Sequence, residues 1–257
     1  MNLYMEIPDM NTTLQAAQIA TPALSANQTI GQIAVELPGA TAVFRRLKLD
    51  FCCGGQIPLA QAVAQKGLDL DAVMVELSAL QSSDILPGVT EPGELIEHLL
   101  TRYHSVHRAQ LPELLRMARR VEAVHRDSPD VPAGLADVLE KVEQDLLLHM
   151  QKEEEILFPL LKSGGAPLVA NPIGMMRSEH VQHSAALDKI NALTNDATPP
   201  QGACNTWRAL YAGIAQFSED LTQHIHLENN VLFSQFEAAA QPAAASNCGA
   251  SACACSA

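Results

Sequence analysis

The stretch His224-Ile225-His226-Leu227-Glu228 decides how this 257-residue chain folds. It lies in a pattern from about residue 207 to 236 in which apolar residues recur every three or four positions, as on the buried face of a helix. His224 and Glu228 occupy two consecutive positions of that face, about one helical turn apart. Burying an ionisable pair costs free energy unless a partner compensates it. A metal ion is the partner that the rest of the sequence supports best.

Three more helices are predicted upstream, over about residues 94–124, 133–162 and 172–195. Each carries two metal-binding residues at core-facing positions, spaced His-x-x-x-Glu or His-x-x-His. Four-helix bundles build metal sites in this way, from side chains that project inward from facing helices. Imidazole and carboxylate groups suit iron, manganese or zinc, and the lack of cysteine at these positions argues against a structural zinc site. The upstream pairs are His104 with His107, His149 with Glu153, and His180 with His183.

Spacing alone does not select the ligands from these eight residues. His107 and His183 are open to three interpretations: ligands, groups behind the ligands, or plain core residues. A lone histidine on an apolar face is usually structural, but eight aligned residues of this kind favour a metal site. The other histidines fall off the core-facing positions, and we expect them in solvent or at an interface: His98, His125 and His226.

Composition narrows the class of protein. Hydrophobic residues make up 47% of the chain but aromatic residues only 4%, which favours helices packed on helices. The formal net charge of −13 argues against broad binding to nucleic acid or to a membrane surface. No apolar run reaches membrane-spanning length, and the start has no signal-peptide pattern. We therefore expect a cytoplasmic protein.

The predicted fold class is all-α, with a small helical domain followed by a four-helix bundle. The small domain is predicted over residues 29–82, where short helical patterns are separated by glycine and proline. Pro-Gly pairs mark a linker over residues 83–93, and the bundle occupies residues 94–237. Residues 1–28 carry little periodicity and are interpreted as an extension. Residues 238–257 are rich in Ala, Ser and Cys and are predicted to be a disordered tail.

The motif Cys52-Cys53-Gly54-Gly55 lies between two short helices of the small domain. Its glycines allow a sharp turn, and the thiols precede a helix N-terminus, where the dipole favours thiolate. The pair could act as a redox switch, could accept iron or nitric oxide equivalents from the bundle, or could simply pack a tight turn. Cys204 is interpreted as a plain buried thiol. Metal capture, mixed disulfides or no role at all are open for the tail cysteines: Cys248, Cys253 and Cys255.

Five segments, in this order, resemble the repair-of-iron-centres family, also called the RIC, YtfE or ScdA type. The resemblance covers about residues 29–237. It implies a hemerythrin-like four-helix bundle with a non-haem di-iron centre, preceded by an N-terminal ScdA-type domain. It also favours a functional role for the cysteine pair. The matching segments are residues 49–55, 102–108, 149–154, 178–180 and 224–230.

The resemblance also implies a ligand set for two irons. The two glutamates of the set would bridge the irons, and an oxo bridge would complete the core. His107 matches a family position that is not a ligand, whereas His183 lies outside the family pattern and its role stays open. The implied ligands are His104, His149, Glu153, His180, His224 and Glu228.

The function that the resemblance implies is a response to nitrosative or oxidative stress. One activity is iron donation to damaged iron–sulfur clusters, and another is the binding of nitric oxide and its reduction to nitrous oxide. Glu179, beside His180, is predicted to relay protons or to line a route for iron, with Glu143 and Asp145 as weaker candidates. The competing class is a non-catalytic module that binds or senses oxygen or nitric oxide, so enzyme activity is left open. Iron–sulfur proteins are the expected clients, and a homodimer is an expected assembly.

Overall fold

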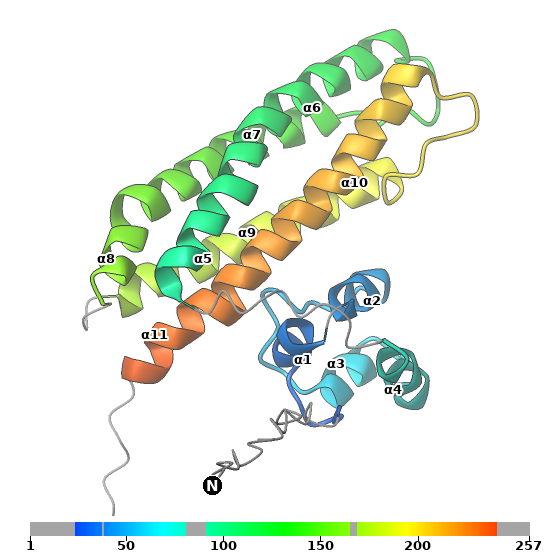
Figure 1. The fold of residues 1–257 in the computed structure, drawn as a ribbon. Coiled ribbons are helices and arrows are strands. Elements are labelled where there is room, and N and C mark those ends of the chain that lie inside the picture. Colours follow the sequence, from blue (N-terminus) through cyan, green and yellow to red (C-terminus); the bar gives the residue numbers. More distant parts are fainter. Residues whose placement is uncertain (1–23, 38, 81–90, 165–168, 241–257) are drawn as a thin grey trace, which may run out of the picture.

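The computed structural model describes residues 24–37, 39–80, 91–164 and 169–240, with the side chains of 238–240 left aside. All regular elements in these residues are helical, and Figure 1 shows a small domain beside a bundle of long helices. The all-α prediction is therefore confirmed. Most of the predicted extension, linker and tail lies outside the described residues, and the last helix of the bundle runs three residues past the predicted boundary at 237.

The small domain consists of four short helices around one apolar core. Thr29 opens the first of them with a capping box, because its hydroxyl accepts from the Gln32 backbone N–H and the Gln32 side chain accepts from the Thr29 backbone N–H. The core residues come from all four helices and from the loop that precedes the third, as with Phe44 and Phe51. The helices are α1 (Ile30–Glu36), α2 (Ala40–Arg46), α3 (Leu59–Gln65) and α4 (Leu70–Ser78).

The bundle consists of four long helices. The first, second and fourth are each interrupted by a π-helical segment, which divides the helix into three pieces. The helix that contains α6 packs against those of α7 and α10, and α9 packs against the same two, which closes the bundle. In chain order the pieces are α5 (Pro92–His98), η1 (Leu99–His104) and α6 (Ser105–Val124); α7 (Leu135–Lys152), η2 (Glu153–Leu157) and α8 (Phe158–Lys162); α9 (Ala170–Thr194); and α10 (Asn205–His226), η3 (Leu227–Leu232) and α11 (Phe233–Ala240).

The π-helical segments shift which residues face the core. A π turn holds one residue more than an α turn, so the positions that follow it rotate around the helix axis. Uninterrupted α-helical spacing from His149 and Glu153 predicts that Ile156 faces the core, and this is wrong: it is 54% exposed, and Leu157 is buried instead. In η3, likewise, the same spacing from His224 and Glu228 predicts a buried Val231, but Leu232 is fully buried and Val231 only partly so.

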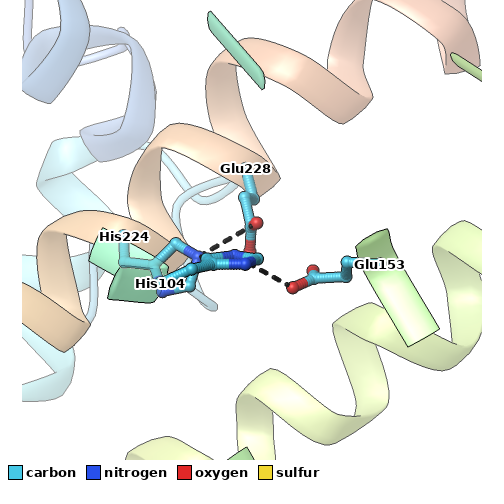
Figure 2. A group of neighbouring side chains, drawn as sticks. All are labelled: His104, Glu153, His224 and Glu228. Atoms are coloured by element: carbon cyan, nitrogen blue, oxygen red, sulfur yellow. Dashed lines mark hydrogen bonds and ion pairs between the residues drawn. The ribbon is translucent and has the colours of Figure 1, made fainter. Parts of the chain in front are cut away.

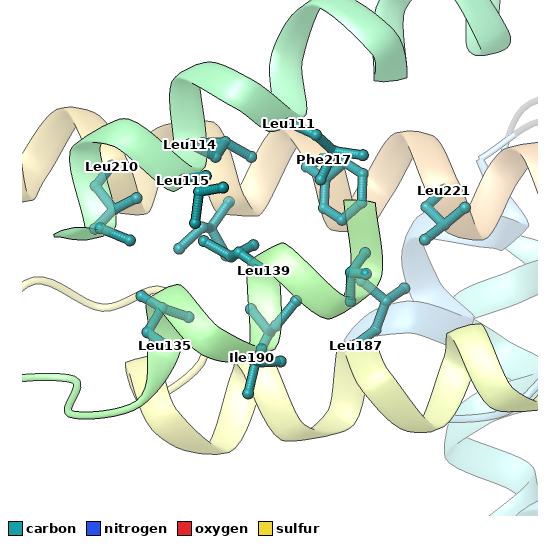
Figure 3. Close-up of a cluster of buried hydrophobic side chains, with 14 of the residues drawn as sticks. Leu111, Leu114, Leu115, Leu135, Leu139, Leu187, Ile190, Leu210, Phe217 and Leu221 are labelled. Atoms are coloured by element: carbon teal, nitrogen blue, oxygen red, sulfur yellow. The ribbon is translucent and has the colours of Figure 1, made fainter. Parts of the chain in front are cut away.

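Two apolar clusters lie on either side of the layer that contains the predicted ligands. Figure 3 shows part of the larger cluster, where leucines from facing helices interdigitate. Each such side chain contributes about 1.5–3 kcal/mol when fully buried, which offsets the cost of a polar layer between the clusters. The larger cluster includes Leu111, Leu139, Ile190 and Phe217, and the smaller one includes Leu99, Leu157, Ile173 and Phe233.

The small domain docks on the bundle at η3 and the end of α10 (Figure 1). Asn230 of η3 donates from Nδ2 to the carbonyl oxygen of Phe51, at 3.1 Å. The ring of Phe51 lies edge-on to His226, with 5.2 Å between centroids. Exposed ion pairs at the edge, such as Lys48 with Asp196, add little to the stability of this contact. The buried contacts therefore hold the two parts together.

Close approach explains two glycines at this interface. A Cβ on Gly31 would lie 2.7 Å from Asn230 Oδ1, and one on Gly55 would lie 2.8 Å from the same atom. Neither Gly54 nor Gly55 has a positive φ, but the loop folds back closely on both: a Cβ would lie 2.9 Å from the Asp50 carbonyl oxygen at Gly54 and 2.5 Å from the Phe51 carbonyl oxygen at Gly55. The Cys-Cys-Gly-Gly motif thus ends in glycine because the loop's own backbone approaches both positions and Asn230 of the bundle also packs against Gly55. Among the described residues, no helix has the length and apolar character needed to cross a lipid bilayer.

Candidate metal centre

The structure brings all six predicted ligands together in the polar layer of the bundle. They form two groups of four, and within each group one ligand atom per residue lies within 4.8 Å of the others. Each of these residues is at most 1% exposed. Figure 2 shows the first group, with side chains from different helices converging on one point. The first group is His104, Glu153, His224 and Glu228, and the second is His149, Glu153, His180 and Glu228.

The two glutamates belong to both groups, and each directs one oxygen toward each group. Glu228 Oε1 lies 3.1 Å from His224 Nε2, and its Oε2 lies 3.0 Å from His180 Nε2. Glu153 repeats this with the other two histidines, at 3.3 and 3.4 Å. A carboxylate in this arrangement is placed to bridge two metal ions.

The π-helical segments coincide with the ligands. Segment η1 ends at His104, η2 begins at Glu153, and η3 contains Glu228. Such segments are rare and occur frequently at functional sites. Here each one sets the position of a ligand relative to the α-helix that continues from it.

Three of the four histidines present their Nε2 atoms to the centre because their Nδ1 atoms are engaged elsewhere, whereas His224 Nδ1 has no hydrogen-bond partner among the described residues. His104 Nδ1 lies 2.7 Å from Glu154 Oε1, and His149 Nδ1 lies 2.9 Å from Glu179 Oε2. A carboxylate can only accept, so each Nδ1 carries the proton and the Nε2 lone pair of the neutral ring faces inward. The Nε2 atoms of His104 and His224 are 3.2 Å apart. A cation between such facing lone pairs would turn a repulsion into coordination.

Unsatisfied carboxylate oxygens point to the same conclusion. Neither oxygen of Glu153 nor Oε2 of Glu228 forms a hydrogen bond with a described residue, and both side chains are fully buried. A buried ionised group without compensation is costly. Imidazole nitrogens and carboxylates are ligands that iron accepts. The residues present therefore fit a metal centre.

The pKa values of the buried groups indicate how the centre balances its charge when no metal is bound. Burial would raise the pKa of Glu228, but the facing His224 and His180 outweigh burial and hold that pKa well below its usual value. Burial would lower the pKa of His149, but Glu153 outweighs it and the pKa rises to about 9. A proton on His149 thus compensates part of the buried negative charge. Metal binding would displace that proton, which couples metal affinity to pH.

Glu179 lies one hydrogen bond behind the centre. Besides His149, it contacts Lys152, whose Nζ is 2.5 Å from Oε1. Burial would raise the pKa of Glu179, but Lys152 and His149 outweigh it and lower the pKa. Glu179 also lines a groove of about 580 Å³ between α7 and α9. The groove includes Asp145, one of the weaker candidates, whereas Glu143 is not among its lining residues.

Two residues next to predicted ligands have roles that the sequence analysis did not assign. Glu154 holds His104 and pairs with Arg108, as Glu179 holds His149 and pairs with Lys152. Asn229 accepts from His180 through its Oδ1, at 2.9 Å. Their place immediately after Glu153 and Glu228 was the available signal, because both lie within the segments that resemble the family.

His107 and His183 are buried but belong to neither group. The ring of His107 lies 5.4 Å from that of His224, and neither of its nitrogens bonds to a described residue. Burial lowers the pKa of His107 to about 2 and that of His183 to about 3. His183 lies edge-on to His149, with 4.9 Å between centroids, and lines the groove. Both are neutral rings beside the centre.

Two of the remaining histidines, His98 and His226, follow the prediction of solvent or an interface, whereas His125 packs within the bundle. His98 is exposed, and His125 is partly buried with Nε2 3.2 Å from Cys204 Sγ. His226 is buried against Phe51 of the small domain. Cys204 was predicted to be buried and is only partly so, because it stands at the N-terminal end of α10.

Cys52 and Cys53 lie outside both groups but close to the bundle. Their sulfur atoms are 3.9 Å apart, so both are free thiols. Cys52 is buried and belongs to the larger apolar cluster of the bundle. Its carbonyl oxygen accepts from Asn229 Nδ2 at 2.9 Å. One side chain, Asn229, therefore connects the cysteine loop with His180.

Comparison with known proteins identifies both parts of the chain. Residues 95–236 match the hemerythrin HHE cation binding domain, and residues 26–81 match ScdA_N, a domain of unknown function. Together with the buried His/Glu groups, the hemerythrin match supports iron binding.

Curated relatives match most of the chain. The iron-sulfur cluster repair protein YtfE of Dickeya chrysanthemi is 49% identical over 210 residues, which cover 80% of this chain and 95% of the relative. Proteins of the same name from Yersinia pseudotuberculosis and Yersinia pestis are each 47% identical over 213 residues, with the same coverage.

Proposed function

Because this chain belongs to the YtfE-type family of hemerythrin-like proteins, we propose that it repairs iron–sulfur clusters damaged by nitrosative or oxidative stress. The observation that carries the proposal is the pair of buried ligand groups that share two carboxylates. Such a centre can hold more than one iron, and relatives that match most of this chain are named for cluster repair.

The centre would hold two non-haem irons, one in each group. His104 and His224 would coordinate one iron, and His149 and His180 the other. Both glutamates would bridge the pair with one oxygen on each iron, and an oxo group would complete the core. When bound, two ferrous ions would supply two electrons and a coordination position each for a diatomic ligand.

The surrounding residues hold the ligands and control access. Glu154 and Glu179 fix the Nδ1 protons of two histidines, which keeps Nε2 free for metal. Glu179 and Lys152 line the α7–α9 groove, and Glu179 also contacts the ligand His149, which suits passage of protons or of iron. Cys52 and Cys53 would receive iron on its way to a client. In this proposal Glu179, Cys52 and Cys53 take part in the movement of protons or iron, but they are not ligands that retain the irons in the centre.

A second activity is supported by the same pair of sites. Two metal positions that share both carboxylates could each take one nitric oxide, so reduction to nitrous oxide is a candidate reaction. The alternative is a module that binds oxygen or nitric oxide without turnover. Anaerobic titration of the reduced protein with nitric oxide, with gas analysis, separates them, because a reductase releases nitrous oxide and a binding module only saturates.

The proposed repair activity is tested by iron transfer. The protein, expected to contain about two irons per chain, is mixed anaerobically with sulfide and an iron–sulfur dehydratase whose cluster has been damaged. Recovery of dehydratase activity supports the proposal, and failure of the iron-loaded protein to exceed an equal amount of free iron contradicts it. A cytoplasmic location, iron–sulfur clients and a homodimeric assembly stay predictions.

A further inference from the structure

Four donor atoms converge where the cysteine loop meets α9, away from the His/Glu centre. Cys52 Sγ lies 3.9 Å from Cys53 Sγ and 3.3 Å from Asp50 Oδ1. Ser184 of α9 completes the set, with its Oγ 3.3 Å from Cys53 Sγ and 3.9 Å from Cys52 Sγ. The loop donors Asp50, Cys52 and Cys53 all lie within 4.8 Å of one another.

These separations match the edges of a metal-centred tetrahedron. With metal–sulfur bonds of about 2.3 Å and metal–oxygen bonds of about 2.1 Å, sulfur atoms lie about 3.8 Å apart and sulfur and oxygen about 3.6 Å apart. The observed sulfur–sulfur distance is 3.9 Å, and the sulfur–oxygen distances range from 3.3 to 3.9 Å. Little movement would be needed to enclose an ion.

Hydrogen bonds within the loop hold the Asp50 carboxylate and the two thiols close together. The Cys53 backbone N–H donates to Asp50 Oδ1 at 2.9 Å, which fixes the carboxylate beside the thiols. The hydrogen bond from Cys52 lowers the pKa of the Cys53 thiol, and the same contact raises the pKa of Cys52. The two sulfurs are therefore joined by a contact in which Cys52 is the donor and Cys53 the acceptor. Cys53 is only partly buried and Asp50 is exposed, so the cluster is open on one side.

We propose that Cys52, Cys53 and Asp50, with Ser184 of the bundle, form a second metal site that binds one divalent transition-metal ion. Binding displaces the protons that the two thiols carry and involves no electron transfer. Two thiolates select a softer ion than magnesium or calcium. The identity of the natural ion as ferrous iron in transit to a client rests on the proposed repair function, whereas the existence of the site does not.

The position of this site suits transfer. Asn229 donates to the Cys52 carbonyl and accepts from His180, so a single residue separates the loop from a ligand of the buried centre. Asp50 is exposed and Cys53 is only partly buried, so a client could approach the site from solvent. A site with few ligands on one loop can release its ion more easily than one built from four helices.

Cobalt(II) is the probe, because thiolate coordination gives it intense near-ultraviolet charge-transfer bands that His/Glu coordination does not. The iron-loaded full-length chain is titrated anaerobically under reducing conditions. Because the tail cysteines could also bind cobalt, the parent carries Ser at three positions: Cys248, Cys253 and Cys255. We expect one equivalent of cobalt with thiolate bands and no loss of iron.

Matched variants show whether the thiolate bands come from Cys52 and Cys53. Cys52→Ser and Cys53→Ser should each abolish or strongly reduce the thiolate bands, and Cys204→Ser should leave them unchanged. Ser184→Ala should weaken cobalt binding about tenfold while keeping the bands, as loss of one weak ligand would. Iron content and circular dichroism report whether each variant is folded.

The outcomes separate this inference from the proposed function. Absence of thiolate bands in the parent, or their persistence in Cys53→Ser, overturns the second site. Bands in the parent together with failed cluster repair leave the second site standing and remove the proposed function. Loss of the resident iron in Cys52→Ser would also overturn the inference, because the cysteines would then belong to the buried centre.

Discussion

The buried His/Glu centre and the cysteine loop bring metal-binding groups together in opposite ways. The centre draws its six side chains from every helix of the bundle, all almost fully buried, with outer hydrogen bonds that fix several of the rings. The loop places three donors within four consecutive residues and borrows a fourth from α9. Ligands held by four buried helices would retain a metal ion, because the helices must separate to release it. Donors on a short, partly exposed loop would release an ion more easily.

Glu153→Leu should have the largest effect and tests whether the centre depends on metal. The iron-loaded protein should lose iron and about 3–5 kcal/mol of stability, because a bridging ligand is gone. The metal-free protein should instead keep or gain stability, since an uncompensated buried carboxylate has been removed. Urea unfolding with and without iron measures both.

His226→Ala is the control for that variant, because His226 is as deeply buried as Glu153 but belongs to neither ligand group. It should keep about two irons. Loss of iron in His226→Ala with retention in Glu153→Leu would contradict the ligand assignment.

The double variant Cys52→Ser with Cys53→Ser tests the role of the cysteine loop. It should keep the iron content and visible spectrum of the bundle while lowering iron transfer about tenfold or more, because these residues lie outside both ligand groups. Transfer to a damaged iron–sulfur protein is measured beside the parent. Equal transfer rates would reduce the cysteines to packing residues, and loss of iron would make them part of the centre.

Asn229→Ala removes the side chain that links the two regions. Loss of the hydrogen bond to His180 should weaken iron binding about 10–100-fold, as for other residues that orient a metal-binding histidine. Competition with a chelator measures this. Asn230→Ala is a useful control: it removes the neighbouring contact to Phe51 without touching a ligand and should leave iron affinity near that of the parent.

Gly31→Ala tests whether the loop position depends on close docking. The added Cβ would lie 2.7 Å from Asn230 Oδ1, so the variant should lose about 1–3 kcal/mol of stability. Gly174→Ala in α9 meets nothing within 4 Å and should gain up to about 1 kcal/mol. Thermal unfolding of both variants gives the comparison. Equal stability of the two would mean that the small domain does not dock as described.

The smallest effect is the reactivity of Cys53 toward iodoacetamide. Its pKa is lowered by the hydrogen bond from Cys52, so its thiolate should form, and alkylation should reach its plateau, at lower pH than for an ordinary thiol. Cys52, whose pKa is raised, should stay unmodified over the same range. Mass spectrometry of peptides after timed alkylation measures both. Faster modification of Cys52 would reverse the assignment of the thiolate.

From the sequence alone, helical spacing predicts the bundle and the eight polar residues that face its core, and the six that meet inside it are among them. Local helical spacing places His149 with Glu153, and His224 with Glu228, on one face, and any packing that buries the apolar residues buries these as well. Two of the six, His104 and His180, were distinguished from His107 and His183 only by resemblance to a family, because all four fall on core-facing positions.

Only the tertiary structure decided the features that depend on distant partners. The π-helical segments break the spacing rule, which is why Ile156 faces solvent and Leu157 the core. Asn229 reaches the Cys52 carbonyl, and Ser184 reaches the Cys53 sulfur, across more than 130 residues of chain. Helical periodicity reports which face of a helix is apolar, and it carries no information on which segment packs against that face. The docking of the small domain, and with it the second cluster of donors, therefore had to come from the folded chain.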